Sequence, residues 1–138
     1  MVKNISNLGD TAVYCDFGSE VNELINANVI DYFNHLSKLI KEKQKDSVII
    51  MAGAAGMFPK NKKFWKSTLP KIKDHFDIAN IHHISTPDGK CDKEFWVDEF
   101  AALLKTANIN KPIWVTEAMI GKCKVLSSYI NAFANGAE

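Results

Sequence analysis

The sequence of 138 residues predicts a single α/β domain of four βα units with parallel strands. Four short segments rich in β-branched and aromatic residues alternate with four segments of helical periodicity. The strand-like segments begin near residues 11, 47, 77 and 111, so each unit spans 30 to 36 residues. This is the length of one strand, one helix and two loops, and strands joined by helical crossovers are normally parallel.

The four predicted strands are short and apolar. They cover residues 11–17, 47–52, 77–84 and 112–116. The second strand has an apolar residue at every position from Val48 to Ala52, a pattern typical of a strand that is covered on both faces. We therefore expect a parallel sheet with helices packed outside it.

The four predicted helices follow these strands. The first carries one apolar stripe, formed by Val21, Leu24, Ile25, Val29, Phe33, Leu36 and Ile40. The second covers about residues 62–76 and contains Pro70, which lacks a backbone donor and should bend or restart the helix. The third covers residues 92–107, with Asp92 as its predicted N-cap. The fourth covers residues 124–134 and aligns Leu126, Tyr129, Ile130 and Phe133.

Two parallel architectures fit this order of elements: an open doubly wound sheet, or part of a (β/α)8 barrel. A complete barrel takes ~250 residues, so four units correspond to half of one. A full barrel would place a further strand after the last helix, which is predicted to end near the last residue, Glu138. The expected architecture is four parallel βα units resembling half of a TIM barrel.

The charge balance excludes several classes of partner. The chain has 17 Lys and Arg against 16 Asp and Glu, a net charge of +1, so no strong field attracts nucleic acid or an anionic membrane. No apolar run approaches the ~20 residues that span a bilayer, and no apolar signal region follows the first residues. We expect a cytoplasmic protein that binds neither nucleic acid nor membrane.

Cysteine and histidine spacing indicates neither a metal nor a cofactor. Cys15, Cys91 and Cys123 are widely spaced, without a C-x-x-C pair, so neither a disulfide framework nor a zinc site is indicated. His82 and His83 are adjacent on a predicted strand and would point to opposite faces, which disfavours a two-histidine metal site. We expect reduced thiols, no metal and no cofactor.

The segment most informative about chemistry is residues 111–118, KPIWVTEA, which places Glu117 at the carboxyl end of a predicted strand. Enzymes of the α/β class position their reactive groups there. Strand alternation predicts that Glu117 shares a face with Val115 and Ile113, and so projects from the buried side of the sheet. The alternative is an ordinary strand-end Glu that turns into solvent or caps the next helix.

Residues 111–118 resemble the K-P-I-W-x-T-E pattern of clan A glycoside hydrolases, which are (β/α)8 barrels. The resemblance extends over residues 46–138, where residues 46–56 are similar to the fifth strand and its loop, and residues 76–84 to the sixth strand. It implies a carbohydrate substrate, with Glu117 as the nucleophile of a retaining mechanism. It further implies that His82 contacts the sugar or orients the carboxylate, and that Trp114 binds substrate.

A retaining mechanism also needs an acid/base carboxyl group ~5 to 5.5 Å from the nucleophile. The family supplies it from the fourth strand in a G-N-E-V-N pattern, and residues 18–22, GSEVN, are similar to it. The resemblance implies that Glu20 is the acid/base. Ser19 replaces the family's Asn, so it offers a hydroxyl to the substrate in place of an amide.

A second resemblance covers residues 4–40, which are similar to the N-terminal strand and helix of the KipI-type small subunit of 5-oxoprolinase and allophanate hydrolase. In that interpretation Glu20 is a first-turn residue favoured by the helix dipole. The chain would then contain a junction near residues 41–46, and its alternative function is that of a non-catalytic subunit or binding module.

Four strands of a barrel also predict association. Such a sheet has two edge strands with unpaired backbone groups. We further expect an uncovered inner face that carries Ile113 and Val115. These features predict a homodimer formed through the exposed sheet edges.

Overall fold

The computed structural model describes residues 12–14, 23–84, 96–119 and 125–138. Helices and strands alternate along the chain, as the sequence predicts. The elements are β1 (Ala12–Tyr14), α1 (Glu23–Lys43), β2 (Val48–Ile50), β3 (Ala54–Ala55), α2 (Pro59–Ile72), β4 (Ala79–Ile84), α3 (Val97–Thr106), β5 (Ile113–Met119) and α4 (Val125–Ala134). None of the described helices is both long and apolar enough to cross a bilayer.

All strand pairs among the described residues are parallel. β1 pairs with β2, and β3, β4 and β5 form a three-stranded sheet in that order. A parallel bridge between Ile50 and Ile78 links the end of β2 to the start of β4, so β2 and β3 are two parts of one interrupted strand. The predicted α/β alternation and the parallel pairing of the strands are therefore confirmed, whereas the described strands lie in a two-stranded and a three-stranded sheet and form no closed barrel.

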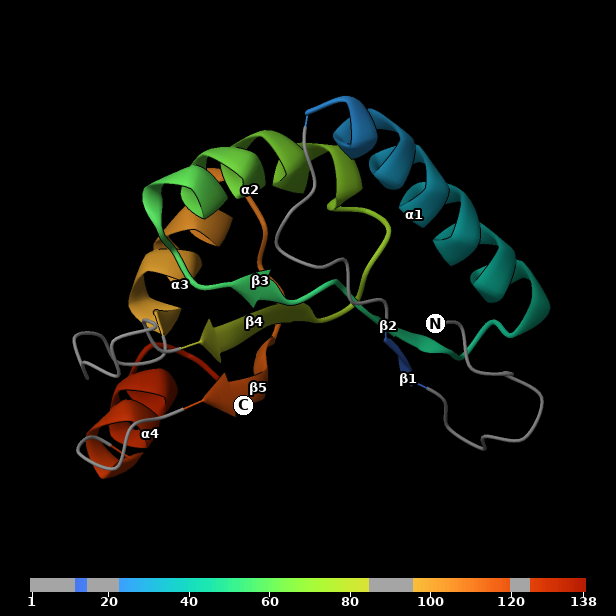
Figure 1. The fold of residues 1–138 in the computed structure, drawn as a ribbon. Helices are drawn as coiled ribbons and strands as arrows, with labels where there is room; N and C mark the ends of the chain where they lie inside the picture. Colours follow the sequence, from blue (N-terminus) through green and yellow to red (C-terminus); the bar gives the residue numbers. More distant parts are fainter. Residues whose placement is uncertain (1–11, 15–22, 85–95, 120–124) are drawn as a thin grey trace.

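The helices lie outside the strands in chain order, and in Figure 1 they form an arc around one side of the sheet. Neighbouring helices contact one another: Asn34 of α1 donates a hydrogen bond to the carbonyl of Lys71 in α2, and Lys62 of α2 forms an ion pair with Glu99 of α3. Buried side chains from α1, α2, α3, β2, β4 and β5 form one apolar cluster between helices and strands. This cluster covers one face of the sheet.

Two helix boundaries differ from the prediction. α2 begins at Pro59. Proline is well tolerated in the first turn of a helix, because the backbone N–H that it lacks would have no partner within the helix there. It continues through Pro70 and ends at Ile72, so of the predicted bend or restart at Pro70 the restart is wrong. α3 begins at Val97, after Trp96 in a left-handed conformation with φ of 57°. The predicted N-cap, Asp92, lies outside the described residues.

α4 has an unusual division between its two faces. Its buried residues are small, Ser128 and Ala132, whereas the large apolar residues Val125, Leu126, Tyr129, Ile130 and Phe133 are exposed. The stripe that the sequence aligns along this helix is therefore turned away from the core. Small side chains on the inner face let the helix backbone lie close to its neighbours, and they leave the larger apolar residues for the outer face.

β5 ends three residues later than the sequence predicts, and the last residues of the chain lie beside it. It runs to Met119, beyond the predicted end at Thr116, so Glu117 lies within the strand. On its outer side, Ile113 forms a parallel bridge with Ala137, and the N–H of Glu138 donates to the Ile113 carbonyl at 2.9 Å. The last residues of the chain thus lie beside β5 and run parallel to it (Figure 1).

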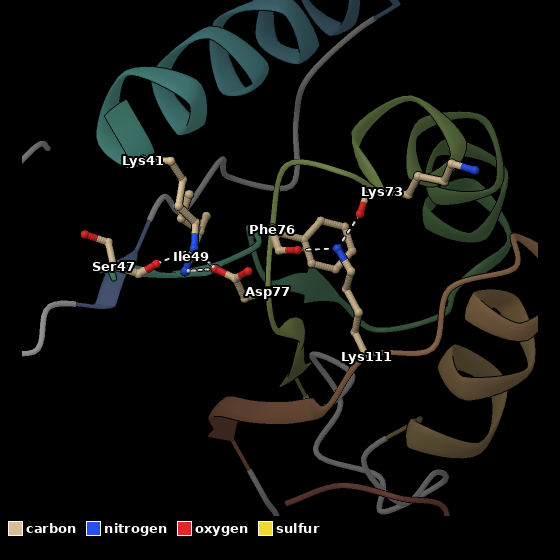
Figure 2. Close-up of polar contacts among 7 residues, drawn as sticks. All are labelled: Lys41, Ser47, Ile49, Lys73, Phe76, Asp77 and Lys111. Carbon is tan, nitrogen blue, oxygen red and sulfur yellow. Dashed lines mark hydrogen bonds and ion pairs between the residues drawn. The ribbon is translucent and has the colours of Figure 1, made fainter. Parts of the chain in front are cut away.

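A charged cluster ties the amino ends of β2 and β4 to α1 (Figure 2). Asp77 Oδ2 lies 2.8 Å from Lys41 Nζ and accepts a hydrogen bond of 2.8 Å from the N–H of Ile49. Partial burial of Asp77 opposes ionisation, but the hydrogen bonds from Lys41 and Ile49 and the positive charges of Lys41 and Lys111 outweigh it, so the pKa of Asp77 is lowered.

Lys111 holds the turn after α2 in the same region. Its ammonium donates to the carbonyls of Lys73 and Phe76 and lies 4.2 Å from the centroid of the Phe76 ring. Partial burial lowers the pKa of Lys111, a shift that the negative charges of Asp77 and Asp74 oppose and the positive charge of Lys41 reinforces.

Candidate active site

The two faces of β5 differ in character. Ile113 belongs to the buried apolar cluster and Val115 packs against it, whereas Trp114 and Thr116 are exposed. The expectation of an uncovered inner face bearing Ile113 and Val115 is therefore wrong. These two side chains face the helices, and the open face carries Trp114 and Thr116.

A bulge in β5 changes the face on which Glu117 lies. Ile81 pairs with Val115, but the next residue of β4, His82, pairs with Glu117, so Thr116 is an extra residue in the ladder. Such a bulge shifts the side chains that follow it by one position. Glu117 is therefore not on the face of Ile113 and Val115, as alternation predicted, but reaches the same open face as Thr116.

Four polar side chains form a continuous chain of contacts on this face. Asn80 Nδ2 donates to the Met51 carbonyl at 3.3 Å, and Thr116 Oγ1 donates to Asn80 Oδ1 at 2.8 Å. His82 Nε2 lies 3.1 Å from Thr116 Oγ1. His82 Nδ1 lies 3.5 Å from Glu117 Oε2. The expected proximity of His82 and Glu117 at the carboxyl ends of β4 and β5 is confirmed.

Burial decreases along this chain of contacts. Asn80 is fully buried and the His82 side chain is only 4% exposed, whereas the side chain of Glu117 is 55% exposed. A buried polar group is stable only when its hydrogen bonds are satisfied, and this requirement fixes the inner members in place. The arrangement thus presents one accessible carboxylate on a rigid, hydrogen-bonded support.

Gly53, in the segment between β2 and β3, packs directly against the His82 ring. A Cβ atom built on Gly53 would lie 2.1 Å from His82 Nε2 and 2.3 Å from the adjacent ring carbons. No side chain fits at this distance, so glycine is required for the ring to occupy this position. The backbone of residue 53 therefore acts as one wall that sets the orientation of His82.

The other predicted site residues are placed as follows. Trp114 lies on the open face opposite Asn80, three residues before Glu117, which corresponds to about 10 Å along a strand. Ser19 and Glu20 lie outside the described residues. No group of three or more His, Cys, Asp or Glu among the described residues could hold a metal ion.

Three residues of the site did not follow from sequence reasoning: Gly53, Asn80 and Thr116. Asn80 is a polar residue inside an otherwise apolar strand, two positions before His82, and this spacing places both on one face. That signal was available in the sequence. The contribution of Thr116 was not, because it depends on the bulge.

The chain was compared with known proteins by family, by curated sequence and by solved structure. No family model, no curated protein and no solved structure matches it.

Proposed function

We propose that the chain is a glycoside-hydrolase-like segment, equivalent to half of a (β/α)8 barrel, that acts on O-glycosidic bonds by a retaining mechanism. One observation carries this proposal: an exposed carboxylate, Glu117, lies two residues before the carboxyl end of the parallel strand β5, with Nδ1 of the buried His82 of the neighbouring strand 3.5 Å from its Oε2. This is the end at which barrel enzymes place their catalytic groups. The K-P-I-W-x-T-E resemblance of residues 111–117 provides independent support.

In this proposal Glu117 attacks the anomeric carbon and forms a covalent glycosyl ester, which water then hydrolyses. Glu20 is the proposed acid/base: it protonates the leaving oxygen and later deprotonates the attacking water. Glu20 follows β1 by six residues, and β1 runs parallel to β2 just as β4 runs parallel to β5. Ser19 and Trp114 are the proposed sugar contacts.

The first prediction tests the nucleophile. Glu117→Gln should reduce turnover of an aryl glycoside by at least ~100-fold, because an amide cannot form the glycosyl ester. Glu42→Gln provides the matched control, since Glu42 is an exposed carboxylate on α1, and it should leave turnover unchanged. Initial rates with a panel of nitrophenyl glycosides give the comparison. Full activity in Glu117→Gln would contradict the proposed role.

Glu20→Ala tests the acid/base separately. It should reduce turnover of substrates with poor leaving groups more than that of activated aryl glycosides, because an activated group needs little protonation. An unmutated protein that hydrolyses no glycoside in the panel would overturn the enzyme proposal. It would favour the alternative, a non-catalytic subunit or binding module.

A further inference from the structure

The exposed large apolar side chains of the described residues are unevenly distributed. They lie on three surfaces: the two end helices of the arc, α1 and α4, and the open face of the sheet (Figure 1). The middle helices, α2 and α3, carry none of them. They are Tyr32 and Leu39 of α1, Val48 and Trp114 of the sheet, and Val125, Leu126, Tyr129, Ile130 and Phe133 of α4, which we call the α4 stripe.

The exposed apolar side chains of α1 lie on the side that faces away from α2. A helix turns about 100° per residue, so Tyr32 and Leu39 lie roughly 160° and 140° around the axis from Asn34, whose amide donates to the Lys71 carbonyl of α2. The half-buried Leu36, four residues after Tyr32, continues the same row. These three residues form the α1 stripe, which faces outward at one end of the arc.

The α4 stripe lies at the opposite end of the arc and has the same chemistry. Val125, Tyr129 and Phe133 follow one another at intervals of four residues, beside the buried Ser128 and Ala132. No residue of α4 is charged. Because charged residues are depleted from the centre of protein interfaces, this face fits another apolar surface better than an acidic or basic partner.

Together the two stripes have the area that a dimer contact needs. The exposed fractions of Tyr32, Leu39 and the α4 stripe add up to about four whole side chains, or roughly 600–800 Å² at ~150–200 Å² for each. A stable interface of standard size buries about 800 Å² on each partner. A symmetric dimer that buries both stripes of each copy would therefore obtain most of this area from α1 and α4.

We propose that a second copy of the chain covers both stripes, with α4 of each copy packed against α1 of the other. A two-fold axis parallel to the strands produces this arrangement, because it keeps the strand direction and brings the α1 end of one arc to the α4 end of the other. The open sheet faces, with Val48 and Trp114, then turn toward each other. Both copies of Glu117 lie at the same end of the dimer, and any catalytic consequence of this rests on the proposed function, whereas the helix packing does not.

Tyr32 and Phe133 are matching positions in this contact. Tyr32 lies nine residues after the first residue of α1, Glu23, and Phe133 lies eight residues after the first residue of α4, Val125. These intervals correspond to about 12–14 Å along each helix. Each helix follows a strand, and the strands are parallel, so the two helices run in the same direction and place these side chains at similar depths.

An exchange of charge tests the contact. Tyr32→Lys and Phe133→Glu each place a charge opposite an apolar side chain, so each variant alone should associate at least ~10-fold more weakly, the effect of losing a buried aromatic contact. In an equimolar mixture, one contact pairs the new lysine with the new glutamate and the other contact is native. We therefore expect the mixture to recover a one-to-one dimer in sedimentation velocity over a range of protein concentrations.

The matched control uses Tyr32→Glu in place of Tyr32→Lys. Its mixture with Phe133→Glu brings two negative charges together and should not recover the dimer. Unmutated association in Tyr32→Lys would overturn the inference, and it is the result expected if α4 packs against α4 of the partner. Equal recovery with Tyr32→Lys and Tyr32→Glu, or a monomeric unmutated protein, would also overturn it.

Both positions are exposed, so each variant should keep its midpoint of unfolding in circular dichroism. If a charged variant does not fold, Tyr32→Ser and Phe133→Ser remove the rings without adding charge, and each should weaken association. No turnover is measured in these experiments. A dimer of the expected kind without glycoside hydrolysis would refute the proposed function alone, and a monomer that hydrolyses glycosides would refute this inference alone.

Discussion

At the scale of single residues, the position of His82 depends on the absence of a side chain at residue 53. The contact distance of 2.1 Å from a Cβ to the ring nitrogen is far below any real carbon–nitrogen contact, so the two groups cannot coexist without movement. His82 is buried and hydrogen-bonded to Thr116, so the ring has little freedom to move away. Steric fit and hydrogen bonding therefore fix the same ring.

Gly53→Ala should consequently destabilise the protein by roughly 1–3 kcal/mol, the usual cost of overpacking. The free energy of unfolding in urea, measured at pH 7, gives this cost. His82→Ala removes the ring, and the cost of Gly53→Ala in that background should fall well below its value in the unmutated protein. Equal costs in both backgrounds would show that the clash is not with His82.

The residues of the site differ in how far they could be predicted. His82 and Glu117 follow from strand ends and from a motif, because the carboxyl ends of adjacent parallel strands lie together. The face of the sheet on which Glu117 lies could not be predicted, because one extra residue in β5 moves the following side chains to the opposite face. A bulge depends on the partner strand and its packing, and the alternation of one strand gives no signal of it.

At the scale of elements, Asp77 joins three of them. It accepts from Lys41 of α1 and from the Ile49 N–H of β2, and it lies two residues before β4 (Figure 2). Its pKa is lower in the folded chain than the ordinary value of 3.8. Its contribution to stability is therefore fully present above the unfolded pKa, and is lost as the pH falls from about 5 through 3.8 and below.

Asp77→Asn should lower the free energy of unfolding by about 1 kcal/mol at pH 7, since the two partners are partly exposed and solvent weakens their attraction. The variant should also lose part of the decline in stability that the unmutated protein shows below pH 5. Urea denaturation between pH 3 and pH 7 measures both effects. Asp46→Asn, at an exposed position just before β2, should change neither.

α4 carries the most exposed of the large apolar side chains on the described surface, with Leu126 74% and Phe133 63% exposed. Tyr129 stacks on Phe133 at 6.5 Å between ring centroids, which makes the patch continuous along the helix. Exposed patches of this kind drive association in water. In a solution of the purified chain, only a second copy of the chain can cover this patch. We therefore propose α4 as a dimer contact in addition to the sheet edges.

Leu126→Lys combined with Phe133→Lys should shift the purified protein toward the monomer. The two positions are exposed, so the substitution should leave the fold and its midpoint of unfolding nearly unchanged. Sedimentation equilibrium over a range of protein concentrations gives the oligomeric state. A control, Lys38→Glu with Lys66→Glu on the exposed faces of α1 and α2, should leave association as it is. An unmutated protein that stays monomeric at high concentration would contradict the proposal.

At the scale of the whole molecule, the alternation of helices with parallel strands could be predicted because it follows from repeated spacing and the crossover rule. The orientation of α4 could not. Its apolar stripe has the same periodicity as a core-facing helix, and periodicity does not say which neighbour a face meets.

Two resemblances meet near residues 41–46, so the segments before and after this junction could fold as one cooperative unit or as two independent units. Phe33 of α1 lies in the same buried cluster as Trp65 of α2 and Phe100 of α3. All three tryptophans, at positions 65, 96 and 114, come after this junction. Their fluorescence therefore reports on the second segment alone, while Phe33 belongs to the first.

If the chain folds as one cooperative unit, Phe33→Ala should lower the free energy of unfolding by about 3–5 kcal/mol, the usual cost of a large cavity in a core. Tryptophan fluorescence should register this loss in full, and the far-ultraviolet circular dichroism transition should coincide with it. Phe100→Ala is the matched control on the other side of the junction and should behave alike in both signals. Two independent units would instead leave the fluorescence midpoint of Phe33→Ala at its unmutated value, while circular dichroism alone reported an early transition from α1.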